Sequence, residues 1–165
     1  AYHSEQVWNE PDFAAAGGGG FSTLYRTPNF QRGLHLPRRG VPDISYNAGI
    51  DTGVLTVWST SGQGANLVFR FGGTSAGSPQ WAGLTALADQ LGHHRIGYIN
   101  DALYGLAHGP FYGALYHDIT VGDNTYHGDI TIQGYSATKG WDPATGLGTP
   151  KANALVPALA ATSHF

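Results

Sequence analysis

The stretch from Asn66 to Gln90, NLVFRFGGTSAGSPQWAGLTALADQ, constrains the fold more than any other part of the chain. It opens with a short apolar and aromatic run, Leu67 to Phe71, of the kind that forms a buried strand. Two glycines interrupt this run, and the residues from Trp81 to Leu91 then recur with helical spacing. We therefore expect a strand that turns sharply into a helix, with Ser75 at the start of that helix.

The start of a helix is a chemically useful place for a serine. The first amides of a helix have no intrahelical partner, and the positive end of the helix dipole lies there, so both favour an oxyanion or a developing negative charge. Pro79 fits the same picture, because the first turn requires no amide partner yet.

Ser75 has three interpretations when this window is read alone. Residues Gly73 to Gly77 match G-x-S-x-G, the strand-turn-helix elbow of α/β-hydrolases. The same letters resemble the G-T-S-x-x-x-P segment of subtilisin-like peptidases, in which Pro79 also matches. The third interpretation is a helix-capping serine in a glycine-rich turn. Other windows must decide between them.

Composition limits the class of protein. A chain of 165 residues with 41% hydrophobic residues is one domain or part of one, and it can bury a sizeable core. No apolar run is long enough to span a membrane, and the opening AYHSEQVWNE is not a signal peptide, so we expect any export leader to be absent from this sequence. Without Cys there is no disulfide, thiolate nucleophile or cysteine metal site, and the redox compartment stays undetermined.

Charge argues against a nucleic-acid partner. Only 12% of the residues are charged, about half the usual share, and the basic residues are scattered apart from Arg38-Arg39. The formal charge is -3 with neutral His, and protonation of all 8 His would raise it to +5. Acid therefore reverses the sign of the net charge.

The remaining elements are short. Residues 43–46 and 54–58 are expected to form strands, and the second of these could pair with 67–71 as a hairpin. Residues 100–107 predict a second helix with Ile99, Leu103 and Leu106 on one face. A third helix is expected from Pro150, and Pro157 should kink or end it.

Two familiar binding motifs can be rejected. The run Gly17 to Gly20 is followed by no Lys-Ser/Thr pair, so it is a turn or a close backbone approach rather than a phosphate loop. An EF-hand that begins at Asp123 would need Glu at its twelfth position, where the chain has Gly134. Asp118 and Asp142 remain either a pair around a hard cation or ordinary turn aspartates.

Several windows together carry a resemblance that none carries alone. EQVWN (5–9), GGGFSTLYRTPNFQ (18–31), RRGVPDIS (38–45), GGTSAGSPQWAGL (72–84), HDITVGDN (117–124) and GWDPATGLGTP (140–150) resemble the sedolisins, the serine-carboxyl peptidases. They occur in the order of that family and at similar spacing over almost the whole chain. The α/β-hydrolase interpretation explains only G-x-S-x-G and is set aside.

The resemblance implies a fold, a nucleophile and a metal. It places residues 1–165 in the C-terminal portion of a single peptidase domain with an α/β, subtilisin-like fold, which is a mostly parallel sheet with helices on both faces. It makes Ser75 the nucleophile. It also implies a calcium ion, held by the following side chains and carbonyls: Asp118, Ile119, Thr138, Gly140 and Asp142. The family usually has Gly at position 138, where this chain has Thr.

The acid-base groups of the family are missing from this chain. Sedolisins activate their serine with a Glu and an Asp four residues apart, and a further Asp donates to the oxyanion. Here the residues four positions after Glu5 and Glu10 are Asn9 and Ala14. Asp43 belongs to a window whose family role is structural. Nothing in the spacing of His117 and His127 supports a base for Ser75 over surface loop histidines.

These observations define two functional hypotheses. In the first, the chain is the C-terminal part of an acid-acting, secreted serine endopeptidase that cleaves peptide or protein substrates through a Ser75 acyl-enzyme. Its partner is the N-terminal portion of the same domain, which supplies the carboxyl groups, so this chain alone should be inactive. In the second, the chain is a truncated, non-catalytic, calcium-binding homologue that acts as a binding module.

Overall fold

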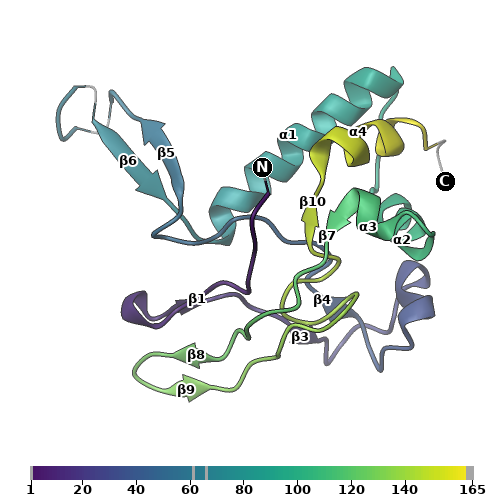
Figure 1. Cartoon of the computed structure of the whole chain (residues 1–165), viewed down its shortest axis with the longest axis horizontal. Helices are drawn as coiled ribbons and strands as arrows, with labels where there is room; N and C mark the ends of the chain where they lie inside the picture. Colours follow the sequence, from purple (N-terminus) through teal and green to yellow (C-terminus); the bar gives the residue numbers. More distant parts are fainter. Residues whose placement is uncertain (1, 61, 66, 163–165) are drawn as a thin grey trace.

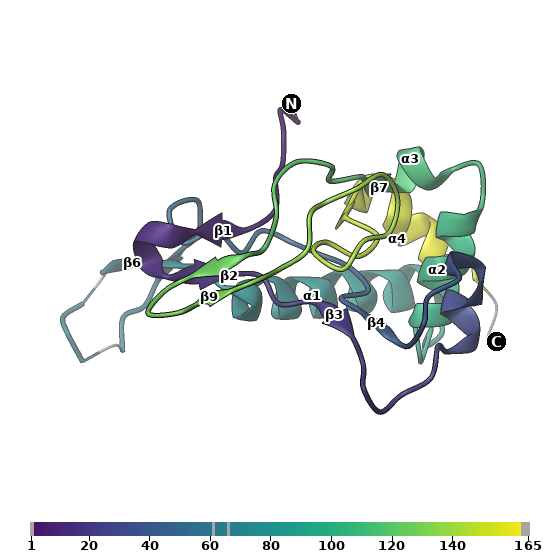
Figure 2. The same cartoon turned by 90° about the horizontal axis from the view of Figure 1, so that it is seen from below.

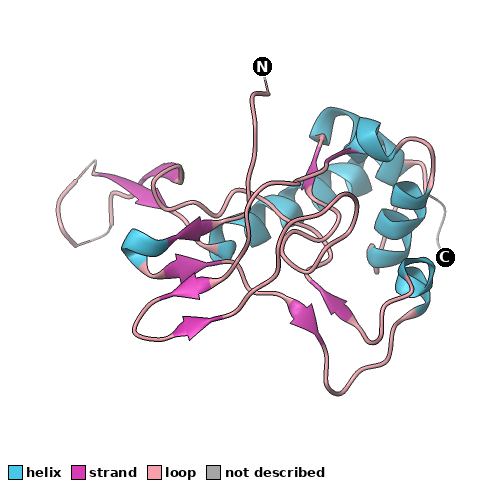
Figure 3. Ribbon diagram, turned by 60° about the horizontal axis from the view of Figure 1, so that its bottom comes forward, coloured by secondary structure: helices cyan, strands magenta, loops and turns pink. Residues whose placement is uncertain are grey.

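The computed structural model describes residues 2–60, 62–65 and 67–162. The helices gather at one end of the molecule, and one long β-hairpin projects from the other (Figure 1). Long loops connect the short strands between them, as the view coloured by secondary structure shows (Figure 3).

Helices build the main hydrophobic core. The α-helices are α1 (Thr74–Gly92), α2 (Asn100–His108), α3 (Tyr112–Leu115) and α4 (Ala152–Ala160), and short 3₁₀ helices form η1 (Pro11–Phe13) and η2 (Asn29–Leu34). Their buried side chains meet in one cluster that includes Trp81, Leu103, Tyr104, Tyr116, Leu155 and Leu159. No helix in the described part of the chain is long and apolar enough to cross a membrane.

The predicted helices are confirmed, with one difference at Pro157. Helix α1 follows the glycine turn as expected, and Leu103 of α2 is buried with Ile99 and Leu106 packed beside it. Helix α4 continues through Pro157 to Ala160, so this proline does not end the helix, which was one of the two effects predicted for it. The buried side chains of Leu155 and Leu159, on either side of the proline, hold the helix against the core.

Strands are short and pair two by two. The pairs are β1 (Asn9–Glu10) with β2 (Ala15–Ala16), β3 (Gly20–Phe21) with β4 (Gly40–Val41), β5 (Val54–Val57) with β6 (Val68–Phe71), β7 (Tyr116–His117) with β10 (Thr149–Pro150), and β8 (Tyr126–His127) with β9 (Thr131–Ile132). All of these pairings are antiparallel. The expected parallel sheet is thus not present among the strands that the structure describes.

The β5–β6 hairpin confirms the strand pairing predicted before the glycine turn. Val54 pairs with Phe71 and Val57 with Val68, so the hairpin leads directly into α1. Its aromatic face is a cluster in which the Trp58 ring lies 5.6 Å from Phe69 and 6.4 Å from Phe71. The hairpin stands away from the core, and several of its apolar side chains are exposed (Figure 1). The prediction that the run from Leu67 to Phe71 is buried was therefore wrong, because this hairpin packs on no second layer of the described chain.

The prediction of a strand at 43–46 was wrong for this chain. The structure assigns no strand to these residues. Their neighbour is the glycine-rich stretch 146–148, where Gly146 and Gly148 both have positive φ. Such backbone cannot form a regular ladder, so only isolated hydrogen bonds connect it to 43–46.

A buried polar network supports the segment around Asp43. The fully buried Gln31 donates to the Gly40 carbonyl and to the Tyr104 hydroxyl, both at 2.8 Å, and accepts from the Gly40 amide. The Tyr104 hydroxyl donates in turn to Asp43, which also pairs with Arg39. Every buried polar group of this network therefore has a partner, as its stability requires.

Candidate functional site

The turn before α1 places Ser75 at the surface. Gly73 is the residue before the helix and has φ of +80°, which favours glycine, and its amide donates to the Ala48 carbonyl at 2.7 Å. Ser75 is the second residue of the helix and is exposed. The structure thus confirms that a glycine turn delivers this serine to a helix start.

Free donors surround the Ser75 position. Among the described residues, no hydrogen bond satisfies the backbone amides of Thr74 and Ser75, and none engages the Ser75 hydroxyl. Gly73, not Ser75, occupies the capping position, and no side chain caps the helix. The capping interpretation of Ser75 therefore does not describe this structure, and the helix start is free to receive a negatively charged atom.

Glu10 fastens the loop that supports this turn. Its carboxylate accepts hydrogen bonds from the Ile50 amide at 2.7 Å, the Asp51 amide at 3.0 Å and the Trp8 indole at 2.7 Å. The backbone of Gly49 and Ile50 packs directly against Gly72, where even a Cβ atom would not fit. Partial burial raises the pKa of Glu10, but the three hydrogen bonds outweigh it and leave the pKa below the usual 4.5.

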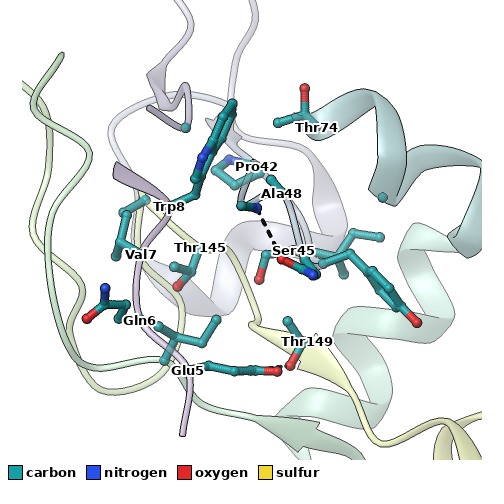
Figure 4. Close-up of a pocket in the computed structure, with 18 of the residues that line it drawn as sticks. Glu5, Gln6, Val7, Trp8, Pro42, Ser45, Ala48, Thr74, Thr145 and Thr149 are labelled. Carbon is teal, nitrogen blue, oxygen red and sulfur yellow. Dashed lines mark hydrogen bonds between the residues drawn. The ribbon is translucent and has the colours of Figure 1, made fainter. Parts of the chain in front are cut away.

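A cavity of about 810 Å³ lies beside the helix start. Its wall is mostly apolar and includes Val7, Trp8, Pro42, Ile44, Tyr46 and Trp81. Thr74, at the beginning of α1, lines this cavity together with Glu5, Ser45 and Thr149 (Figure 4). Ser75 itself is exposed and is not among the residues that line this cavity.

Glu5, Glu10 and His117 are engaged away from Ser75. The Glu5 carboxylate accepts from the Thr149 hydroxyl at 2.5 Å, and Glu10 is fully used by the loop at 50–51. The His117 ring stacks on Tyr2 at 3.7 Å, and burial lowers its pKa. None of these groups, nor His127 in β8, forms a hydrogen bond with Ser75 within the described residues.

The candidate calcium ligands converge on one loop. Both oxygens of Asp118 accept from the Gly140 amide, at 3.1 and 3.0 Å. Asp142 is 1% exposed and accepts from the amides of Thr138, Ala144 and Thr145. Ile119 is buried beside them, in a small second cluster with Val7 and Ala144.

The hydroxyl of Tyr112 lies against the acidic side chains of this loop. Its oxygen lies 3.1 Å from Asp118 and 3.0 Å from the Leu147 carbonyl, and its single proton is shared between these two acceptors. Burial raises the pKa of Tyr112, and the charges of Asp118 and Asp142 raise it further. No group of three acidic, His or Cys side chains is found within the described residues, so a metal here would need backbone carbonyls as well.

Sequence reasoning missed two features of the site. Glu10 was considered only as a catalytic base, and its hydrogen bonds to Ile50 and Asp51 join residues about 40 positions apart. The cavity is also assembled from several distant segments, which no local pattern reveals. The structural role of Glu10 could have been inferred from Trp8, two residues earlier, because a half-buried indole donor requires a partner.

Comparison with known proteins identifies the relatives of this chain, although no protein-family model matches it. Kumamolisin from Bacillus sp. (strain MN-32) is 37% identical over 164 residues, which cover 94% of this chain and 27% of kumamolisin. Sedolisin from Pseudomonas sp. (strain 101) is 35% identical over 90% of this chain and 24% of its own length. Tripeptidyl-peptidase 1 from Macaca fascicularis is 31% identical over 86% of this chain and 27% of its own length.

The fold comparison points the same way. A structure of Pseudomonas sedolisin, a serine-carboxyl proteinase complexed with pseudo-iodotyrostatin, matches with a TM-score of 0.79 and 32% identity over 94% of this chain and 40% of that chain. This match supports the subtilisin-like fold expected from the sequence. The chain spans about a quarter of the length of these curated relatives, and it belongs to the sedolisin family.

Proposed function

We propose that this chain is the nucleophile-bearing, C-terminal portion of a serine-carboxyl endopeptidase and that Ser75 forms the acyl-enzyme. The observation that carries the proposal is the exposed Ser75 at the start of α1, beside free amides, in a chain of the sedolisin family. In acyl transfer the Ser75 hydroxyl loses its proton to a base while its oxygen attacks the peptide carbonyl. The helix start then faces the negative charge that develops.

The base and the oxyanion acid come from outside the matched region. No described carboxylate or imidazole reaches Ser75, and the chain corresponds to 40% of the solved sedolisin chain. We infer that a Glu and an Asp acting as base, a further oxyanion Asp, and the parallel strands of the sheet belong to the N-terminal portion of the domain. Carboxyl bases work in acid, which suits an acidic, extracellular site of action on peptide or protein substrates.

Calcium is the metal that these loops fit best. Asp118, Asp142 and the carbonyls of Ile119, Thr138 and Gly140 offer only oxygen ligands, which Ca²⁺ prefers. The buried Asp142 forms no ion pair among the described residues, although a buried charge favours a cationic partner. A bound ion would join the 117–119 segment to the 138–142 loop and would have a structural effect.

The nucleophile is tested by covalent labelling of the assembled domain. The chain is combined with the portion of kumamolisin that it does not match, and the mixture is treated with a fluorophosphonate in acid. Labelling at Ser75, lost in Ser75→Ala and kept in Ser78→Ala, is the expected result. Modification that survives Ser75→Ala, or none in a mixture that has formed a complex, contradicts the role of Ser75.

Calcium is tested by its effect on unfolding. A ligand that binds only the folded chain raises its stability, by about 2.7 kcal/mol at a concentration of 100 times Kd. We expect calcium, but not an equal concentration of magnesium, to raise the thermal midpoint, and Asp118→Asn to remove the gain while the exposed Asp129→Asn keeps it. An equal gain in Asp118→Asn places the ion elsewhere.

The second candidate is a non-catalytic module that keeps the scaffold. The engagement of Glu5, Glu10 and His117 away from Ser75 favours it for the chain on its own. A chain that binds calcium and a partner, while its complex neither labels at Ser75 nor cleaves peptides, is the outcome that selects this candidate.

A further inference from the structure

The segment from 13 to 42 carries an excess of positive charge. No Asp or Glu lies within it, and it holds four of the eight Lys and Arg residues: Arg26, Arg32, Arg38 and Arg39. Its formal charge is therefore +4, whereas the other four basic and eleven acidic residues give the rest of the chain -7. A chain with a formal net charge of -3 thus keeps one strongly basic segment.

The fold brings two parts of this basic segment together. Beyond the β3–β4 pair, the Ser22 amide donates to the Arg39 carbonyl at 2.8 Å, and the Arg39 amide donates to the Tyr25 carbonyl at 3.2 Å. Arg26 follows Tyr25 and Arg38 precedes Arg39, so these two arginines lie on neighbouring stretches of main chain. Arginines that are scattered along the sequence thus belong to one place in the structure.

Two apolar side chains project from the tip of this segment. The Ser22 hydroxyl accepts from the amides of Leu24 and Tyr25, at 3.1 and 2.9 Å, and so fixes a tight turn. Leu24 is 80% exposed, the largest exposed fraction among the large apolar side chains of the described residues, and Tyr25 is 70% exposed. The connection from β3 to η2 reaches the lower edge of the molecule in Figure 2, so this turn protrudes.

Two of the arginines beside this tip are available to an anion. Arg39 pairs with Asp43, and its guanidinium lies 5.4 Å from the centre of the Phe30 ring. Arg26 and Arg38 are exposed and form no ion pair within the described residues. A single exposed apolar side chain needs no explanation, but here an adjacent apolar pair and two unpaired cations occur together.

The tip lies apart from the surface that the proposed peptidase uses. None of residues 22–39 lines the cavity beside the start of α1. A portion of the domain that brings carboxyl groups to Ser75 approaches that cavity. The exposure of Leu24 and Tyr25 is therefore expected to persist in the assembled domain.

An anionic lipid surface is the partner that this chemistry fits best. Anionic headgroups attract arginines near the surface, apolar side chains enter the boundary with the acyl chains, and a tyrosine suits the headgroup level. A soluble acidic polymer would contact the same arginines but would leave Leu24 in water. A protruding apolar tip with cations beside it therefore favours the membrane.

We propose that the loop formed by residues 22–39 binds the surface of an anionic membrane. Leu24 and Tyr25 enter the interface, and Arg26 and Arg38 contact the phosphate and carboxylate groups of the lipids. The chain then lies on the membrane without crossing it. Membrane contact goes beyond the proposed function and does not depend on it.

Vesicle binding at pH 7 tests the arginines. The probe is a vesicle of phosphatidylcholine with about 30% phosphatidylserine, and pure phosphatidylcholine is the reference. The double variant Arg26→Gln, Arg38→Gln should bind the anionic vesicle about tenfold to thirtyfold more weakly, because each arginine near the surface contributes about fivefold. Arg70→Gln, Arg95→Gln removes the same charge from exposed positions outside the loop and should change binding little.

A dye tests the insertion of the tip. The chain has no Cys, so Leu24→Cys can carry a single fluorophore that responds to its surroundings. Its emission should shift to shorter wavelength on anionic vesicles, whereas the same dye on Leu87→Cys, an exposed position of α1, should report water. Poly-glutamate is the soluble comparison. Equal binding to this polymer, with the dye at position 24 still in water on vesicles, identifies an acidic polymer as the partner and overturns the proposal.

The β5–β6 hairpin is the rival apolar surface. Leu24→Ser should weaken vesicle binding about tenfold, because one apolar side chain no longer enters the interface, whereas Leu55→Ser in the hairpin should not. Binding that is lost in Leu55→Ser and kept in Leu24→Ser overturns the proposal. Equal binding to neutral and anionic vesicles, or equal losses in the two arginine variants, overturns it as well.

The assembled domain provides the last comparison. Addition of the portion of kumamolisin that this chain does not match should leave vesicle binding unchanged. Loss of vesicle binding in that complex would show that the rest of the domain covers the tip, and the proposal would fail. Labelling of Ser75 is measured separately, so failure of either proposal leaves the other standing.

Discussion

Glu10 is the residue through which the N-terminal segment supports the nucleophile turn. Both of its oxygens accept hydrogen bonds, so Glu10→Gln replaces one acceptor with an amide group that faces donors. We expect the Ile50 and Asp51 amides to exchange roughly threefold to tenfold faster, and the Gly73 amide to follow them. Asp12→Asn, an exposed acidic residue in η1, is the control. An unchanged exchange rate at the Ile50 amide would show that Glu10 does not stabilise this loop.

The pKa of Glu10 sets the pH range of this effect. Because the folded-state pKa lies below 4.5, the ionised carboxylate contributes stability at pH values above 4.5. That contribution is lost as the pH falls through the lower folded-state value. Acid down to about pH 4.5 should therefore leave the difference in exchange between Glu10→Gln and the unmodified chain unchanged, and stronger acid should reduce it.

The Tyr104 hydroxyl connects the two ends of the buried polar network. It links the buried Gln31 to Asp43, so Tyr104→Phe should lower the free energy of unfolding by about 1–3 kcal/mol. Tyr98→Phe, at an exposed position, should change it little. Urea unfolding at pH 7 measures both, and equal midpoints for the two variants would exclude a stabilising network.

The same tyrosine makes stability sensitive to alkali. Burial raises the pKa of Tyr104 above the ordinary 10.0, and burial does the same for Tyr116. The neutral hydroxyls stabilise the fold below pH 10, and stability falls as the pH rises above the unfolded-state value. Each tyrosine contributes a slope of at most about 1.4 kcal/mol per pH unit, so Tyr104→Phe should have the shallower decline.

At the scale of elements, the β5–β6 hairpin depends on its aromatic face. An isolated two-stranded hairpin is marginal in water, and each aromatic pair adds about 0.5–1.5 kcal/mol. Trp58→Ala removes the ring that contacts both Phe69 and Phe71, so amide exchange within the hairpin should accelerate while the urea midpoint of the core stays the same. Leu55→Ala removes no ring from this cluster and should have the smaller effect. Equally faster amide exchange in both variants would show that the aromatic cluster is not what stabilises the hairpin.

Local patterns predicted elements well where the signal lay within one segment. The strand before Gly72, its hairpin partner and helix α1 follow from periodicity and glycine placement, and the structure confirms them. The pattern at 43–46 failed because a strand also needs a partner, which local sequence does not specify. The residues alone left Asp118 and Asp142 as either a cation-binding pair or ordinary turn aspartates, because their separation in sequence carries no local signal, and the family resemblance favoured the pair.

At the scale of the whole molecule, apolar exposure and low charge act together. The hairpin exposes Leu55, Val57 and Val68 by 66%, 63% and 61%, and the chain carries few charges to keep copies apart. Figure 2 shows that the hairpin extends well beyond the helices in a second view as well. Repulsion between copies that meet through this element therefore depends on their net charge.

Self-association should therefore be strongest near the isoelectric point of about 6.2. Above it the chain is negative, and in acid the protonated histidines make it positive, so repulsion returns on both sides. Sedimentation velocity at pH 4.5, 6.2 and 8 should show the largest species at the middle value. The double variant Val57→Thr, Val68→Thr leaves the charge unchanged and should reduce that species, whereas Leu24→Thr, which is also exposed but lies outside the hairpin, should not. Association that persists equally in the double variant would mean that another surface, and not the hairpin, brings the copies together.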